Sequence, residues 1–108
     1  MKIIAVTSCS TGIAHTYMAA AAIEKSAKKL GHQVKVETQG SIGIENKLSS
    51  KDIKDADFVI FGADVAVIGK ERFNGKIIFD CGSEIFIKNK DKAMDQAIKY
   101  YNERINER

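Results

Sequence analysis

The chain of 108 residues fits one domain, 1–108, and its 44% hydrophobic and 29% charged residues are typical of a chain with a single core. No stretch approaches the roughly 20 apolar residues that cross a bilayer, and the apolar run at residues 3–6 is too short for a secretory signal. We therefore expect a cytoplasmic protein. The net charge of +3 is mild, and no aromatic residues interleave with Lys25, Lys28 and Lys29, so we expect no nucleic-acid partner.

The first half of the chain predicts a strand, a helix, a second strand and a loop. Residues 2–8 are apolar and rich in β-branched side chains, which is typical of a strand buried on both faces. From residue 16 or 17 to residue 30 the alanine-rich sequence favours a helix, and Gly31 is suited to end it. Residues 33–38 alternate and predict a strand at or near a sheet edge. Residues 39–49 contain two glycines and predict a loop.

The second half predicts two more strands with helices between and after them. Ser50 is expected to cap a short helix that runs to residue 56. Residues 57–62 are apolar and predict a buried strand, and residues 65–74 predict a short helix. Residues 76–81 predict the last strand.

The last predicted element is an amphipathic helix over residues 91–106. Its apolar face consists of Met94, Ala97, Ile98, Tyr101 and Ile105.

Strands and helices thus alternate four times, which predicts an α/β fold. The expected architecture is a single, Rossmann-like domain, with a four-stranded parallel sheet in the order 2-1-3-4 and helices on both faces. In this order the first and third strands end at the switch point of the sheet. Folds of this kind hold their ligands there, outside the carboxyl ends of the strands.

The most informative segment is Ser8-Cys9-Ser10-Thr11-Gly12-Ile13-Ala14-His15-Thr16, which follows the first strand and opens the first helix. A loop in this place turns backbone N–H groups inward as an anion-binding nest, and the helix adds the positive end of its dipole. These groups favour a thiolate on Cys9, which is the nucleophilic form of cysteine. The alternative is a small apolar residue at the end of a buried strand. The hydroxyl side chains on both sides of Gly12 favour the functional cysteine.

Cys81 also ends a predicted strand, but no helix is expected to open behind it, so a structural cysteine is favoured there. The first and fourth strands of the predicted sheet lie roughly 10 Å apart, which is too far for an undistorted disulfide. Neither cysteine has the sequence partners of a zinc site, and the two histidines, His15 and His32, are not expected to supply them.

Two more residues have alternative interpretations. His15 could stabilise the thiolate or a phosphoryl group on it, or it could cap the first helical turn. Asp64, at the end of the third strand, could be a general acid, although a surface or loop-capping aspartate is the simpler interpretation.

Three functions compete at this stage: a phosphoryl carrier, a cysteine phosphatase and a regulator that senses phosphate or a partner. Cysteine phosphatases place an arginine six residues after the nucleophile to clamp the phosphate, and this chain has His15 there. Neither GxxxxGK[ST] nor GxGxxG after a strand occurs, so nucleotide binding is not expected.

From Cys9 to Thr16 the sequence resembles the fructose-type IIB domain of the bacterial phosphoenolpyruvate-dependent sugar phosphotransferase system (PTS), which carries Cys-Pro-Thr-Gly-Ile-Ala-His-Thr at its phosphorylation site. The resemblance extends from about residue 2 to about residue 80. Further matching blocks are Tyr17-Met18-Ala19-Ala20, Val36-Glu37-Thr38-Gln39-Gly40-Ser41-Ile42-Gly43, Ala63-Asp64-Val65-Ala66 and Gly69-Lys70-Glu71-Arg72-Phe73. Ser10 replaces the usual proline, and it keeps an N–H donor that proline lacks.

The resemblance implies a phosphotransferase component without cofactor or metal. Cys9 would accept a phosphoryl group from a phosphohistidine of a IIA protein and pass it to fructose, or a related sugar, that enters through the membrane permease IIC. The protein would be cytoplasmic and peripherally associated with that permease. By position, the phosphate loop would consist of Ser10, Thr11, Gly12, Ile13, Ala14, His15 and Thr16. Gln39, Gly40 and Asp64 would lie at its rim.

Overall fold

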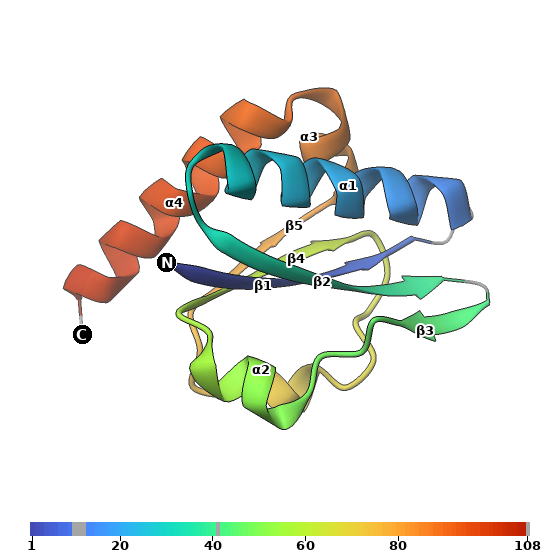
Figure 1. The fold of residues 1–108 in the computed structure, drawn as a ribbon, viewed down its shortest axis with the longest axis horizontal. Coiled ribbons are helices and arrows are strands. Elements are labelled where there is room, and N and C mark those ends of the chain that lie inside the picture. Colours follow the sequence, from blue (N-terminus) through green and yellow to red (C-terminus); the bar gives the residue numbers. More distant parts are fainter. Residues whose placement is uncertain (10–12, 41, 108) are drawn as a thin grey trace.

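The computed structural model describes residues 1–9, 13–40 and 42–107, and its centre is a five-stranded sheet in the order β3-β2-β1-β4-β5. Helices α1, α3 and α4 cover one face of this sheet, and α2 covers the other (Figure 1). The strands are β1 (Lys2–Ser8), β2 (Gln33–Gly40), β3 (Gly43–Glu45), β4 (Phe58–Ala63) and β5 (Ile78–Cys81). The helices are α1 (Ile13–Lys29), α2 (Ser50–Asp55), the 3₁₀ turn η1 (Lys70–Phe73), α3 (Ser83–Lys88) and α4 (Lys90–Asn106).

Two apolar clusters, one on each face of the sheet, hold the layers together. Strand β1 contributes to both clusters, because its successive side chains point to opposite faces. Ile3 and Ala5 belong to the cluster beneath α1, α3 and α4. Ile4 and Val6 belong to the cluster on the other face, with residues of α2 and η1. Every one of these four side chains is at least 98% buried. The central strand is therefore covered on both faces, as its continuous apolar run predicts.

The predicted parallel order is confirmed for four strands, but the prediction of a sheet of only four strands is wrong. β1 pairs in parallel with β2 and β4, and β4 pairs in parallel with β5. The fifth strand, β3, pairs antiparallel with β2 inside the segment 39–49 that was expected to be a loop. Gly43 has a φ of 108° at this turn, a backbone conformation that glycine adopts readily and other residues rarely adopt. The sheet is therefore mixed.

Several element boundaries also differ from the prediction. Helix α1 begins at Ile13, before the alanine-rich run, and Gly31 follows its end with φ of 82°, as expected. Residues 65–74 contain only the 3₁₀ turn η1. In α4, Met94 and Ala97 are buried as predicted, whereas Ile105 is 40% exposed because it lies in the last turn, beyond the residues that pack on the core. None of the helices in the described ranges combines the length and apolar character needed to cross a bilayer.

The N-cap of α2 is Ser49 and not Ser50. The Ser49 hydroxyl accepts a hydrogen bond from the Asp52 N–H, and the Asp52 carboxylate accepts one from the Ser49 N–H. This capping box satisfies two backbone donors at the start of the helix. The sequence contains a signal for this choice: an acidic residue, Asp52, stands three positions after Ser49, whereas Ile53 stands three positions after Ser50.

Replacing Ser49 with alanine is therefore expected to lower the free energy of unfolding by about 1 kcal/mol. Ser50→Ala is the matched control: it removes an identical hydroxyl one residue away, and it should change the stability by less than about 0.5 kcal/mol. Urea unfolding of the two variants measures the difference. Equal losses in both variants would contradict the assignment of the cap.

Candidate functional site

The site lies where β1 and β4 end side by side at the switch point of the sheet. Cys9 directly follows β1, and Asp64 directly follows β4. The two strands are in register at Ser8 and Ala63, and the Asp64 N–H donates to the Ser8 carbonyl over 2.7 Å. Two residues before Cys9, the Thr7 hydroxyl donates to the Thr16 carbonyl of α1, so this side of β1 faces α1. Because side chains alternate between the two faces of a strand, the Cys9 side chain points to the same face as Thr7, toward the first turns of α1.

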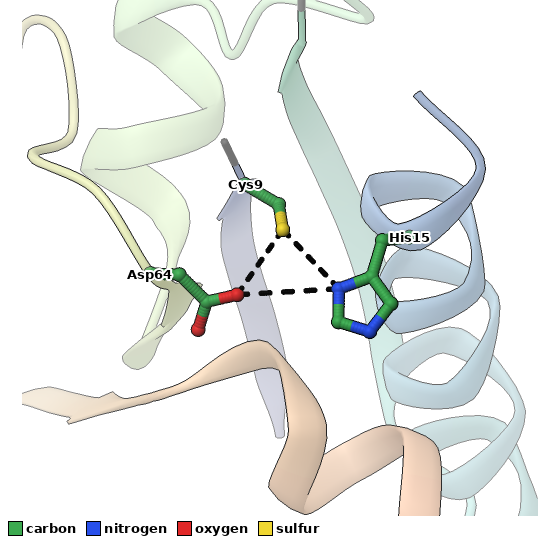
Figure 2. A group of neighbouring side chains, drawn as sticks. All are labelled: Cys9, His15 and Asp64. Atoms are coloured by element: carbon green, nitrogen blue, oxygen red, sulfur yellow. Dashed lines mark hydrogen bonds and ion pairs between the residues drawn. The ribbon is translucent and has the colours of Figure 1, made fainter. Parts of the chain in front are cut away.

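Three side chains meet at this point, as Figure 2 shows. The sulfur of Cys9 lies 3.2 Å from Nδ1 of His15 and 3.2 Å from Oδ2 of Asp64, and the thiol donates to the carboxylate. His15 Nδ1 and Asp64 Oδ2 are 4.0 Å apart. Cys9 is only 7% exposed, whereas about a third of each of the other two side chains is exposed. The sulfur is therefore sheltered, and the partly exposed side chains of His15 and Asp64 lie beside it.

Ser83 is a fourth member of the site, which the sequence analysis missed. Its hydroxyl donates to Asp64 Oδ2 over 2.6 Å, and its N–H donates to Oδ1 over 3.0 Å. The same hydroxyl oxygen lies 3.3 Å from His15 Nδ1. The expectation that no helix opens behind Cys81 is wrong: α3 begins at Ser83, two residues later. The segment Gly82-Ser83-Glu84 repeats the strand-to-helix arrangement of the Cys9 segment, and this similarity could have revealed it.

The hydrogen bonds from Ser83 hold Asp64 in its ionised form. The pKa of Asp64 is lowered chiefly by the Ser83 hydroxyl and then by the Ser83 N–H. Partial burial opposes this effect, and the Cys9 thiol and the charge on His15 add smaller lowering contributions. A carboxylate with a fixed orientation and a negative charge therefore stands beside the sulfur. Asp64 thus lies beside Cys9 and His15, and it also accepts from the first N–H of α3, which agrees with the loop-capping interpretation and not with that of a simple surface aspartate.

Of the other residues of the predicted phosphate loop, three lie outside the described ranges and three belong to α1. Ser10, Thr11 and Gly12 lie outside the described residues. Ile13 contributes the first residue of α1, and Ala14 is exposed on that helix. Thr16 is 1% exposed and lies beneath the first turn, where its carbonyl binds Thr7. The predicted anion nest stays a prediction.

The predicted rim residues Gln39 and Gly40 lie at the same edge of the sheet as Cys9, but the side chain of Gln39 points to the opposite face. Gln39 pairs in register with Ser8, and Gly40 follows it at the same edge of the sheet. The side chain of Gln39, however, lies on the α2 face: its amide nitrogen donates to Glu37 and to the Ile68 carbonyl, and its amide oxygen accepts from the Ile68 N–H. Gln39 therefore anchors the segment between β4 and η1, and its amide does not bind the sulfur.

A buried ion pair completes this network on the α2 face. Arg72 of η1 donates two parallel hydrogen bonds, of 3.0 and 2.9 Å, to the carboxylate of Glu37 on β2. It also donates to the carbonyls of Ile68 and Gly69. The Glu37 side chain is completely buried. The pair and Gln39 together fix the chain that leaves β4 just after Asp64.

Cys81 agrees with its interpretation as a structural cysteine. Burial is the main cause that raises its pKa to about 12, and the charges of Asp80 and Asp64 add to the effect. Cys81 therefore stays a thiol at neutral pH. No disulfide joins Cys9 to Cys81, and β4 lies between their strands, as in the predicted strand order.

The fold and the site define an α/β protein with a sheltered cysteine at the switch point of its sheet. A family model described as "PTS system, Lactose/Cellobiose specific IIB subunit" matches residues 4–96. The chain therefore belongs to the IIB family of the sugar phosphotransferase system. Within this family it is a fructose-type component, and it serves as a phosphoryl carrier.

Individual relatives define the fructose-type branch. The chain is 50% identical over 95 residues to the PTS system fructose-like EIIB component 2 of Escherichia coli K12, which covers 88% of this chain and 90% of the relative. It is 45% identical over 98 residues to the fructose-like PTS system EIIBC component of the same strain, which covers 89% of this chain but 20% of that longer protein. The crystal structure of a domain of the fructose-specific IIABC component of Borrelia burgdorferi has a TM-score of 0.84 and 44% identity, with 91% of this chain and 93% of that domain covered.

Proposed function

We propose that Cys9 is the residue that carries the phosphoryl group, accepting it from a phosphohistidine of a IIA protein and passing it to fructose or a related sugar. The observation that carries this proposal is the position of the Cys9 sulfur. It lies at the switch point of the sheet, 3.2 Å from both His15 Nδ1 and Asp64 Oδ2. Cys81 has no such surroundings among the described residues, and its raised pKa makes it a poor nucleophile.

The two transfers balance around the sulfur. In the first, the P–N bond of the donor phosphohistidine breaks while a P–S bond forms, the thiol loses its proton and the donor imidazole gains one. Asp64 Oδ2 is the acceptor to which the Cys9 thiol already donates. In the second, the P–S bond breaks while a P–O bond to a sugar hydroxyl forms, and the hydroxyl proton restores the thiol. Between the two transfers, the tautomer of His15 with its proton on Nδ1 would place a donor beside the phosphorylated cysteine, since Nδ1 lies 3.2 Å from the sulfur.

The relatives support the choice of partners. One relative is named as an EIIBC component and a solved domain as part of a IIABC component, so IIB units of this type occur joined to IIC and to IIA. We infer that this chain works at the cytoplasmic face of the membrane, between a IIA donor and a IIC permease. The names of the relatives support fructose or a similar sugar as the acceptor.

Intact mass after incubation with phosphoenolpyruvate, the general phosphotransferase proteins and a fructose-type IIA tests the proposal. The wild type should gain one phosphoryl group, Cys9→Ser should gain none, and the control Cys81→Ser should behave as the wild type. Addition of IIC-containing vesicles and fructose should then remove the group. A phosphorylated donor with no mass gain on the wild type, or equal gain on Cys9→Ser, would refute it. Turnover of a chromogenic phosphate ester would instead indicate the cysteine phosphatase.

A further inference from the structure

We propose that Cys9, His15 and Asp64 form a binding site for a borderline-soft divalent cation, with Zn²⁺ as the best-fitting ion, and that the bound ion excludes the phosphoryl group from the sulfur. The second half of this proposal rests on the proposed function, whereas the first half does not. Cys9, His15 and Asp64 form no zinc motif in the sequence, because they are separated by 6 and 49 positions. The fold brings their ligand atoms together.

The distances between the three atoms are close to those of a tetrahedral metal site. With metal–ligand bonds of about 2.3 Å to sulfur and about 2.0–2.1 Å to nitrogen and oxygen, ligand atoms of a tetrahedral zinc site lie about 3.4–3.6 Å apart. The corresponding distances here are 3.2 Å for Sγ to Nδ1, 3.2 Å for Sγ to Oδ2 and 4.0 Å for Nδ1 to Oδ2. To complete the geometry, Nδ1 and Oδ2 would approach each other by about 0.5 Å and the two distances to sulfur would lengthen by about 0.3 Å (Figure 2).

The donor set selects the kind of ion. One thiolate, one imidazole and one carboxylate suit Zn²⁺, whereas Mg²⁺ and Ca²⁺ prefer oxygen ligands throughout. Three protein ligands leave a fourth position for water, which is the pattern of accessible zinc sites. His15 and Asp64 are each about one-third exposed, so an ion can enter from solvent on their side. The sulfur itself is nearly buried, which protects the metal–thiolate bond.

The surroundings of Asp64 prepare it as a ligand. The Ser83 N–H binds Oδ1, and this contact leaves Oδ2 turned toward Cys9 and His15. The Ser83 hydroxyl donates to Oδ2 and keeps the carboxylate in place. Hydrogen bonds of this kind, which orient a ligand from behind, typically contribute 10- to 100-fold to metal affinity.

Metal binding and phosphoryl transfer compete for the same sulfur. When the ion binds, an S–metal bond forms and the S–H bond breaks, with the proton released to solvent. The electron pair that would attack phosphorus is then engaged by the metal. Zn²⁺ should therefore act as a reversible inhibitor of phosphoryl acceptance, and a chelator should restore it.

Titration of the reduced protein with Zn²⁺ in competition with a chromophoric chelator measures the site without any phosphoryl transfer. We expect one ion per chain, with affinity at least tenfold lower in Cys9→Ser, His15→Ala and Asp64→Asn. Cys81→Ser and His32→Ala, which change the other cysteine and the other histidine, should bind as the wild type does. Circular dichroism establishes that each variant is folded. Co²⁺ as a spectroscopic probe should show a thiolate-to-metal charge-transfer band that is absent in Cys9→Ser.

The outcomes separate the two halves of the proposal. Equal affinity in the wild type and in Cys9→Ser, or a Co²⁺ complex without the thiolate band, would overturn the site. If the wild type binds Zn²⁺ but still gains a phosphoryl group from IIA at saturating Zn²⁺, the exclusion is overturned while the site stands. If the metal-free wild type gains no phosphoryl group from IIA, the proposed function is contradicted. The Zn²⁺ titration would still show whether the metal site exists.

Discussion

Replacement of Arg72 with alanine is expected to lower the free energy of unfolding by about 3–5 kcal/mol, because it leaves a buried carboxylate without its cation. The Glu37 side chain has no exposed surface in the wild type, and Arg72 supplies two of its hydrogen bonds together with the only charge that neutralises it among the contacts of the described residues. The remaining donors to Glu37 are the Gln39 amide and the Leu48 N–H, and neither carries a charge. Urea unfolding of the wild type and the variant at about pH 8 measures the loss.

The loss should become smaller as the pH falls. Burial raises the pKa of Glu37, but the hydrogen bonds from Arg72, Gln39 and the Leu48 N–H outweigh it, so the pKa in the wild type is lowered. The wild type therefore keeps the contribution of this group until the pH falls through the lowered pKa, below about 4.5. Without Arg72 burial prevails and the pKa rises, so the folded variant binds a proton and gains relative stability between about pH 8 and pH 5.

A double variant provides the control for this prediction. Glu37→Leu combined with Arg72→Met removes both charges and keeps apolar volume in their place, so it should recover most of the lost stability. A loss in Arg72→Ala that is below about 1 kcal/mol, or that is the same at both pH values, would contradict the role of the buried charge. A double variant as unstable as Arg72→Ala would show that other contacts of the arginine carry the effect.

Replacement of Asp64 with asparagine is expected to shift the phosphoryl group from IIA toward Cys9 by roughly tenfold at equilibrium. The Asp64 carboxylate lies 3.2 Å from the sulfur, so it would stand beside the negative charge of a bound phosphoryl group. Two unit charges 4 Å apart repel by about 4 kcal/mol at an effective dielectric constant of about 20. Since Asp64 is a third exposed, solvent reduces this to the order of 1.4 kcal/mol, which corresponds to tenfold.

The ratio of phosphorylated IIB to phosphorylated IIA after equilibration, measured by intact mass, tests this prediction. Asp95→Asn is the matched control, because it removes the same charge from an exposed position on α4 and should leave the ratio unchanged. The rate at which phosphoryl transfer reaches equilibrium is measured separately. Asp64 accepts the hydrogen bond from the Cys9 thiol, so its replacement should slow the transfer. An unchanged or lower ratio in Asp64→Asn would contradict the repulsion between the two charges.

The part of the site that could be predicted from the sequence depends on two strongly patterned strands. The apolar runs at residues 2–8 and 57–62 identify β1 and β4 because both are buried on two faces. Once these strands are neighbours, Cys9 and Asp64 must lie at the same edge of the sheet. His15 follows on the helix that opens behind Cys9. Local pattern and the rules of parallel sheets place Cys9 and Asp64 at one edge, but they favoured a surface or loop-capping role for Asp64 and began the helix only after His15.

Two features could not be predicted because they depend on contacts distant in the sequence. Strand β3 has only three residues, all exposed, so it has no alternating pattern and exists through its pairing with β2. Helix α3 has six residues and no side-chain cap at Gly82, so its start gives no strong sequence pattern. Ser83 is held in the site by Asp64, 19 residues away. Tertiary structure decides both features.

The lengths of the outer strands also govern how this sheet can meet other sheets. Its two borders are β3, with three residues, and β5, with four. Strand addition and amyloid-like stacking need a long row of unpaired N–H and carbonyl groups, and neither border offers one. The eight-residue β2, which would offer such a row, is shielded by β3 over part of its length. The small hairpin thus shortens the stretch of β2 at which another strand could add to this sheet.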